Sequence, residues 1–150
     1  MTSSVVLVTG GFDPIHSGHI SLLNSAKQIA PLSALAVGLN SDHWLTRKKG
    51  KPFMPFYDRL MVVRALRVVD NVLEFDDSND TACDAIAQCL EIYDKVIFCN
   101  GGDRHNENTP EFNLYKDDSR VIYRWGVGGT GKKQSSSWLL EEWDNRDKSS

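Results

Sequence analysis

The sequence predicts an α/β protein whose core is a doubly wound sheet of five parallel strands. Short apolar runs of strand type alternate along the chain with segments in which apolar residues recur at helical spacing. Such alternation is typical of parallel sheets that carry helices on both faces. The right-handed crossover rule then leaves the doubly wound sheet as the simplest topology. The 150 residues suit a single domain, residues 1–150, with a frayed tail over residues 145–150.

The first predicted strand and helix flank a pair of glycines. Residues 5–9 form a β-branched apolar run that stops at Gly10 and Gly11. A helical pattern follows, and Pro31 ends it. The apolar face of this helix is expected to contain Ile20, Leu23, Ala26 and Ala30.

The next strand and helix are separated by a basic segment. Residues 35–39 form a second apolar run, which stops at the polar residues 40–42. Residues 46–55 are basic and contain two prolines, so we expect a loop there. The helical pattern returns at Phe56, with an apolar side made of Leu60, Val63 and Leu66.

The remaining elements repeat the alternation. Residues 72–75, 96–99 and 120–123 are predicted strands, and residues 81–92 and 136–143 are predicted helices. In doubly wound sheets, ligands bind beyond the carboxyl ends of the strands. The segments expected at that edge are residues 10–18, 40–55, 100–110 and 126–137.

Composition limits the classes of partner. A net charge of -3 argues against broad binding to nucleic acid or to an anionic membrane surface, so any anion site must be local. Cys83, Cys89 and Cys99 lack metal-type spacing and are expected to be buried thiols in a reducing cytoplasm. No apolar stretch has the length of a signal peptide's hydrophobic region or of a membrane span, so we expect a cytoplasmic protein.

The segment from Gly10 to His19 carries the strongest functional pattern. Two glycines allow close approach of the backbone to a ligand, and a helix start follows them. His16 and His19 are three residues apart, so both should project from one side of that helix start into the cleft. With Gly18 between them they suit a triphosphate. Half of a zinc site and a pair of surface histidines remain alternatives.

The same segment resembles the GxFDxxHxGH signature of the cytidylyltransferase-like nucleotidyltransferases. Every specified position matches, and the strand–loop–helix context agrees. The resemblance implies a Rossmann-like nucleotidyltransferase fold, with His16 and His19 stabilising the transition state at the nucleotide phosphates. It assigns nucleotide binding to Thr9, Gly10, Gly11, Phe12, Asp13 and Gly18.

Two further segments resemble the family. Residues 40–42 match its NSD or STD segment, which places Asn40 and Asp42 at the acceptor. The basic segment after them resembles the loop that delivers a lysine to the phosphates, which makes Lys48 and Lys49 catalytic. Arg59 stands in the place of the family's recurrent arginine and is the remaining expected catalytic residue.

The late part of the chain resembles the family less closely. Gly101, Gly102 and Asp103 resemble its GGD segment, and Asp103 could instead be only a turn residue. Ser135, Ser136 and Ser137 resemble its late serine-threonine motif at a helix start. The arginine that often accompanies this motif is missing, and Lys132 or Lys133 could replace its charge. All six glycine, aspartate and serine positions are expected to bind nucleotide.

Residues 126–133 also fit two unrelated glycine-rich patterns. The dinucleotide pattern lacks an acidic residue after a following strand, and the phosphate-loop pattern has Lys133 where Ser or Thr should hold magnesium. A glycine-rich loop that closes over the phosphates at the histidine motif explains the same residues.

The resemblance implies transfer of CMP from CTP to a small phosphorylated polyol or sugar, with release of pyrophosphate. Transfer of AMP from ATP to a sugar phosphate or a similar phosphomonoester is the alternative. A catalytically silent nucleotide-binding module is the alternative from another class. The expected cofactor is Mg²⁺, held mainly by the nucleotide and water with no protein ligand assigned. A homodimer is expected.

Overall fold

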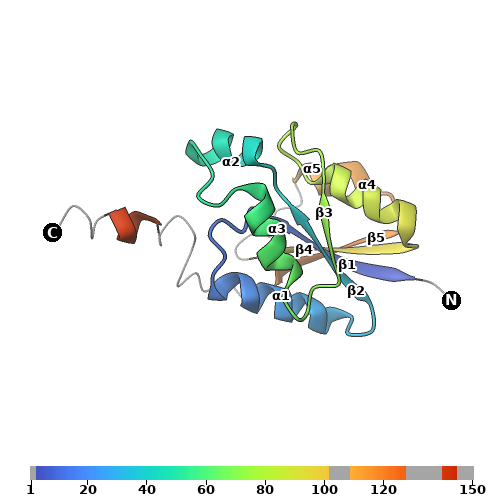
Figure 1. Cartoon of the computed structure of the whole chain (residues 1–150). Helices are drawn as coiled ribbons and strands as arrows, with labels where there is room; N and C mark the ends of the chain where they lie inside the picture. The colour runs from blue at the N-terminus through green and yellow to red at the C-terminus, as the bar shows by residue number, and fades with distance from the viewer. Residues whose placement is uncertain (1–2, 102–108, 128–139, 145–150) are drawn as a thin grey trace.

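The computed structural model describes residues 3–101, 109–127 and 140–144. Within them, five strands form one sheet in the order β3-β2-β1-β4-β5 (Figure 1). All four strand pairings are parallel. The strands are β1 (Ser4–Gly10), β2 (Ala34–Leu39), β3 (Asn71–Glu74), β4 (Lys95–Gly101) and β5 (Val121–Val127). The predicted five-stranded doubly wound sheet is confirmed.

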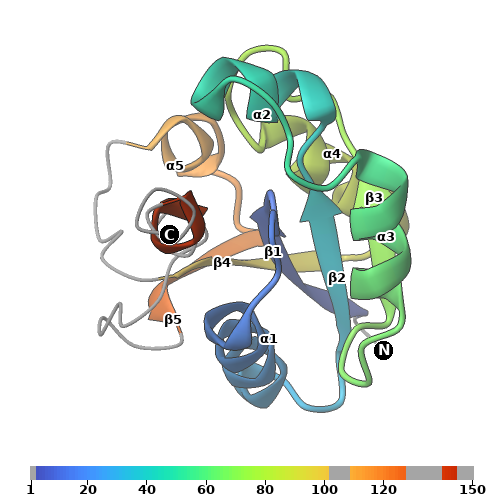
Figure 2. The same cartoon turned by 60° about the vertical axis from the view of Figure 1, so that its left-hand side comes forward.

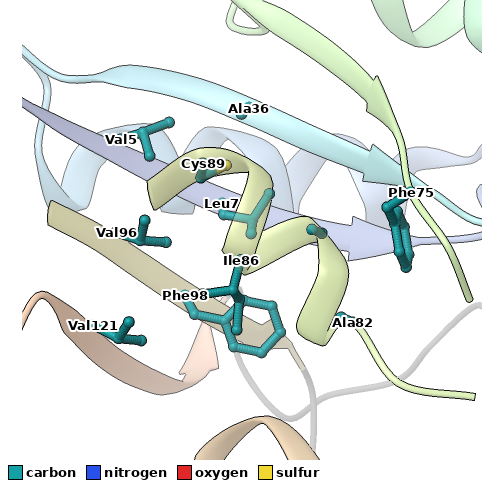
Figure 3. Packing of buried hydrophobic residues seen from close by; sticks show 11 residues of the cluster. Val5, Leu7, Ala36, Phe75, Ala82, Ile86, Cys89, Val96, Phe98 and Val121 are labelled. Atoms are coloured by element: carbon teal, nitrogen blue, oxygen red, sulfur yellow. The ribbon is translucent and has the colours of Figure 1, made fainter. Parts of the chain in front are cut away.

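Helices cover both faces of the sheet. They are α1 (Ser17–Ile29), α2 (Asp42–Lys49), α3 (Phe56–Arg64), α4 (Cys83–Ile92) and α5 (Pro110–Tyr115). Alternate residues of β1 separate the two core layers, because successive strand side chains point to opposite faces. Val5 and Leu7 pack with Ile86 of α4, as Figure 3 shows, whereas Val6 and Val8 pack with Leu23 of α1. Both layers are almost free of solvent exposure.

The predicted face of α1 is correct in part. Leu23 and Ala26 are fully buried and Ala30 packs against the same core cluster, but Ile20 is 36% exposed. Ile20 lies in the first turn of α1. The prediction for α3 is confirmed, because Val63 is buried and Leu60 and Leu66 pack beside it.

The prediction of a loop over residues 46–55 is wrong for its first part, which belongs to α2. The Oγ atom of Ser41 accepts a hydrogen bond from Trp44 N at 3.0 Å and caps the helix start. Asp42 in the first turn and the basic residues of the last turn both complement the helix dipole. Gly50, at φ 95°, ends the helix. The basic charges therefore favour a helix end here.

Residues 100–110 were also expected to form a loop, yet α5 begins at Pro110. Thr109 Oγ1 accepts from Phe112 N, and proline occupies the first helical position. Residues 140–144 are helical, in agreement with part of the helix predicted over 136–143. The rest of that helix and the predicted frayed tail lie outside the described residues. None of the helices in the described ranges is long and apolar enough to cross a membrane.

The strand order places the loop after β1 at the switch point of the sheet. The chain moves from β1 outward to β2 and β3, then returns to β4 on the other side of β1. Ligands of doubly wound sheets bind at this point, beyond the carboxyl ends of the strands. Figure 2 shows α2 beyond the end of the β2 arrow and α5 beside the same edge.

Candidate active site

A cavity of about 450 Å³ opens at this edge of the sheet. Its wall combines the end of β1, the start of α1, helix α2, the segment after β3 and α5. The structure thus brings together residues that are far apart in the sequence. The predicted site residues on the wall are Thr9, Gly10, Gly11, Phe12, Asp13, His19, Asn40, Lys48 and Lys49.

His16 and His19 cap the start of α1 reciprocally. His16 Nδ1 accepts a hydrogen bond from Gly18 N at 3.0 Å, and His19 Nδ1 accepts one from His16 N at 3.1 Å. The two rings lie 4.1 Å apart between centroids. Since each Nδ1 accepts a hydrogen bond, the neutral rings carry their proton on Nε2. Both imidazoles therefore keep an Nε2–H donor.

Burial keeps these rings neutral. Burial, together with a smaller effect of the neighbouring His16, lowers the pKa of His19 from 6.5 to about 4. Burial also lowers the pKa of His16. At neutral pH His19 is therefore a neutral hydrogen-bond donor on the cavity wall, packed 4.7 Å from the Phe12 ring between centroids.

The two glycines of the motif are required by packing as well as by any ligand. A Cβ at Gly11 would lie 2.9 Å from Leu45 Cδ2, on α2. A Cβ at Gly10 would lie 3.1 Å from the Phe12 ring. Phe12 itself is buried at φ 52°, a conformation that L residues rarely adopt. The turn after β1 is thus tightly packed between α2 and its own phenylalanine.

Asp13 holds the segment between α2 and α3 against this turn. Its carboxylate accepts hydrogen bonds from Phe53 N at 2.7 Å and from Met54 N. Lys49 Nζ lies 2.8 Å from Asp13 Oδ2 and donates to the Asp13 carbonyl at 2.6 Å. Asp13 is only 2% exposed, so these contacts are sheltered from water. Its carboxylate organises the cavity wall and fixes the position of the Lys49 amine.

Arg59 lies beneath the site, with 1% of its surface exposed. Its guanidinium donates to the carbonyl oxygens of Met54, Gly11 and Asn40 at 2.8–2.9 Å. It also pairs with Asp42 Oδ1 at 2.7 Å. One side chain therefore joins the ends of β1 and β2 to the start of α2. These contacts are those of a positioning residue.

The expected acceptor residues Asn40 and Asp42 are both engaged by other side chains. Asn40 Nδ2 donates to Asp77 Oδ2 at 3.0 Å, and Asp42 pairs with Arg59. Asp77, which is 4% exposed, also accepts from Ser41 N and Ser41 Oγ. Contact of either residue with an acceptor remains a prediction.

Lys48 and Cys99 also line the cavity. Lys48 Nζ lies 4.6 Å from the centroid of the Trp44 ring, in a cation–π contact. Burial raises the pKa of the Cys99 thiol to about 12, so it is no nucleophile at neutral pH. Among the described residues, no three His, Cys, Asp or Glu side chains group as they would around a metal ion.

Two predicted nucleotide-binding residues, Gly18 and Gly101, are described but do not line the cavity. Gly101 ends β4, and Gly18 belongs to the first turn of α1. Gly126 and Val127 end β5, whereas residues 128–133 of the glycine-rich segment lie outside the described residues. Also outside them are Gly102, Asp103, Lys132, Lys133, Ser135, Ser136 and Ser137.

Sequence reasoning missed three residues of the site. Trp44 and Glu111 line the cavity, and Asp77 holds the turn after β2. The Thr-Pro-Glu start of α5 is a helix signal that could have placed Glu111. Asp77 has no local signal, because its partners come from a turn more than 30 residues earlier in the chain.

Comparison with known proteins decides the family. The model of the cytidylyltransferase-like family matches residues 7–105. The chain belongs to this family. The predicted family is therefore confirmed.

Curated relatives match only part of their own length. The chain is 35% identical over 116 residues to the bifunctional protein HldE of Streptomyces coelicolor, covering 76% of this chain and 23% of that protein. It is 38% identical over 106 residues to the HldE protein of Erwinia tasmaniensis, covering 69% and 20%. The cytidylyltransferase-like chain thus corresponds to a minor part of these relatives.

Solved structures share the fold at low identity. A lipopolysaccharide core biosynthesis protein from Thermoplasma volcanium superposes with a TM-score of 0.61 at 23% identity, covering 82% of this chain and 96% of that one. A putative nicotinate-nucleotide adenylyltransferase from Vibrio parahaemolyticus gives a TM-score of 0.62 at 15% identity, covering 93% and 85%. The predicted Rossmann-like nucleotidyltransferase fold is confirmed.

Proposed function

We propose that this chain transfers a nucleotidyl group from a nucleoside triphosphate to a small sugar or polyol phosphate and releases pyrophosphate. The observation that carries the proposal is the reciprocal capping of His16 and His19. It leaves two neutral Nε2–H donors at the switch point of the sheet, with His19 on the cavity wall. A binding module would need no such fixed pair of donors.

The reaction requires little covalent chemistry from the protein. An acceptor phosphate is already anionic, so no general base is needed to form the nucleophile. One of its oxygens attacks the α-phosphorus, the bond to the bridging oxygen breaks, and pyrophosphate leaves. The Nε2–H groups of His16 and His19 donate to the charge that develops on the phosphates. Their neutral state lets them donate without exchanging a proton with solvent.

Lysine charge supports the same step. Lys48 and Lys49 stand in the last turn of α2 and line the cavity. Asp13 holds the Lys49 amine on the wall, where it can meet a phosphate oxygen. Arg59 acts through the backbone atoms that it holds, so its catalytic effect is one of position.

The nucleotide is the finer part of the proposal, and ATP is favoured over the CTP expected first. The segment over residues 49–55 resembles heptose-1-phosphate adenylyltransferase, and the HldE relatives fit adenylyl transfer to a sugar phosphate. CTP remains the second candidate, because the spacing from Ser41 to Arg59 also resembles glycerol-3-phosphate cytidylyltransferase. Nucleotide contacts of Gly101 to Asp103 and of Ser135 to Ser137 belong to the same proposal.

Magnesium and a second copy of the chain are further parts of the proposal. The carboxylate of the histidine motif, Asp13, already binds two amides and Lys49, which fits an ion held by phosphate oxygens and water. When bound, Mg²⁺ would offset the charge of the β- and γ-phosphates. A homodimer and a location in a reducing cytoplasm are also proposed, and sedimentation analysis tests the oligomeric state.

A panel of substrates tests the function. The protein would be incubated with magnesium, each of the four nucleoside triphosphates and a set of sugar and polyol phosphates, and pyrophosphate would be measured. We expect release with ATP and a sugar phosphate, and none when the acceptor is omitted. Nucleotide binding without pyrophosphate for any acceptor would favour the silent binding module instead.

A further inference from the structure

A buried carboxylate reaches the cavity from the face of the sheet opposite to the histidines. Glu111, on α5, is 6% exposed and lines the cavity. Its Oε1 accepts a hydrogen bond from Ala82 N at 2.9 Å, at the start of α4. No described residue donates to Oε2. None of the roles assigned above uses this side chain.

The position of Glu111 is fixed from both sides. Tyr123 Oη donates to the Glu111 carbonyl at 2.6 Å and so ties α5 to β5. The hydrogen bond from Ala82 N fixes Oε1, and the positive end of α4 favours a negative charge there. A buried carboxylate oxygen is costly unless it accepts a hydrogen bond. Oε2 therefore suits a ligand that brings a donor into the cavity.

The two sides of the cavity are lined by groups of opposite charge. On the side of α1 and α2, His19, Lys48 and Lys49 supply donors and positive charge, and Lys49 is already paired with Asp13 at 2.8 Å. On the side of α4 and α5, Glu111 and Asp80 supply carboxylates, and Asp80 is already paired with Arg47 at 2.9 Å. Phosphate would be repelled from the second side. A ligand that spans the cavity needs an anionic end and an end rich in hydrogen-bond donors.

We propose that Glu111 accepts hydrogen bonds from hydroxyl groups of the phosphorylated acceptor and thereby selects polyhydroxylated phosphates over simple ones. The inference rests on the proposed function, because it names a chemical feature of the acceptor in that reaction. Hydroxyls fit better than an ammonium group, since one buried carboxylate oxygen can accept from neutral donors without burying a second charge. A site built to bind a hydroxyl rejects the analogue that lacks it, because its polar group is left unpaired.

The test compares phosphorylated acceptors that carry hydroxyl groups with one that carries none. Glycerol 3-phosphate and glucose 1-phosphate would be compared with propyl phosphate, which has the phosphate and no hydroxyl. The variant is Glu111→Gln, whose amide oxygen still accepts from Ala82 N and whose NH₂ group replaces the free carboxylate oxygen. Glu91→Gln, an exposed position on α4, is the matched control. Calorimetric binding of each acceptor and KM values for acceptor and nucleotide are both measured.

The expected result is selectivity that depends on Glu111. The wild-type protein and Glu91→Gln should prefer the better hydroxylated acceptor to propyl phosphate by about tenfold or more. Glu111→Gln should reduce that ratio by about fivefold while the nucleotide KM stays unchanged. An equal ratio in Glu111→Gln, or an effect on nucleotide KM alone, would overturn the inference.

Two further outcomes distinguish a failure of this inference from a failure of the proposed function. If no acceptor yields pyrophosphate, the proposed function fails, and the calorimetric selectivity still decides the role of Glu111. If Glu111→Gln does not fold, equal affinity of the wild-type protein for propyl phosphate and the hydroxylated acceptors would overturn the inference. Ethanolamine phosphate is included because its preferred binding, lost in Glu111→Gln, would assign an ammonium partner and contradict our proposal.

Discussion

The backbone N–H of His16 donates to Nδ1 of His19, three residues further along α1, at 3.1 Å. Gly18 N makes the corresponding bond to His16 Nδ1. Each ring thus caps the helix with one nitrogen and keeps the other as a donor. This arrangement adds capping bonds to the expectation that both side chains face the cleft, and it links the stability of α1 to the chemistry of the site.

Replacing His19 should therefore separate capping from catalysis. His19→Asn places an amide oxygen near the position of Nδ1, so it should keep the bond from His16 N while losing the Nε2 donor. We expect kcat to fall about 10²-fold with little change in the free energy of unfolding. His19→Ala should lose activity similarly and also lose about 1 kcal/mol of unfolding free energy. Steady-state kinetics and urea unfolding check both, and wild-type turnover by His19→Asn would remove the histidine from the mechanism.

The lowered pKa of His19 predicts a loss of stability at acid pH. Between pH 6.5 and pH 4, the unfolded chain binds a proton at this ring that the folded chain does not, so the free energy of unfolding falls as pH falls. The fall attributable to His19 should approach about 2–3 kcal/mol at pH 4. Urea unfolding across this range would show a flatter profile for His19→Asn. Parallel profiles for the two proteins would contradict the assignment of a neutral, buried ring.

Replacement of Arg59, even by lysine, should lower the stability of the protein. A lysine amine cannot reach three carbonyl oxygens and Asp42 at once, because only a guanidinium presents donors in a planar fork. We expect Arg59→Lys to lower the free energy of unfolding by about 3 kcal/mol. Arg64→Lys, an exposed arginine at the end of the same helix, should change it by less than about 0.5 kcal/mol. Equal stability of the two variants would show that the buried contacts of Arg59 are dispensable.

Gly50 offers a test of the unexpected helix α2. At φ 95° an alanine would be strained, although no heavy atom lies within 4 Å of its Cβ. Gly50→Ala should therefore lower the free energy of unfolding by about 1 kcal/mol through the backbone alone. Lys51→Ala, next in the chain, is the control and should be nearly neutral. A stable Gly50→Ala protein would indicate that α2 does not end at this residue.

The fold was predictable because its signals are local. Each strand of the sheet has a short apolar run, and the glycine pair marks the end of β1. The wrong predictions concern helices whose main sequence signal is an N-capping residue. Ser41 starts α2 and Thr109 starts α5, but basic residues and prolines nearby were interpreted as loops.

Which residues belong to the site was easier to predict from the sequence than the contacts that those residues make. The histidine motif led to the edge of the sheet where the cavity opens, and several of its residues line that cavity. The pairing of Asp13 with Lys49 and the burial of Arg59 depend on segments 30 or more residues apart, which no local pattern encodes. Glu111 could not be predicted as a site residue for the same reason. Its hydrogen-bond partner is Ala82, and its neighbours across the cavity come from α1 and α2.

The most direct test of nucleotidyl transfer follows the α-phosphorus. ATP labelled at that atom would be incubated with magnesium, a hexose or heptose 1-phosphate and the protein, and the label would be located by chromatography. The account predicts label in a nucleoside diphosphate sugar, with one pyrophosphate formed for each labelled product, and both formed about 10²-fold more slowly by His19→Asn. Label that stays in ATP or appears as ADP or AMP, with no sugar product for any nucleotide or acceptor, would contradict the central claim.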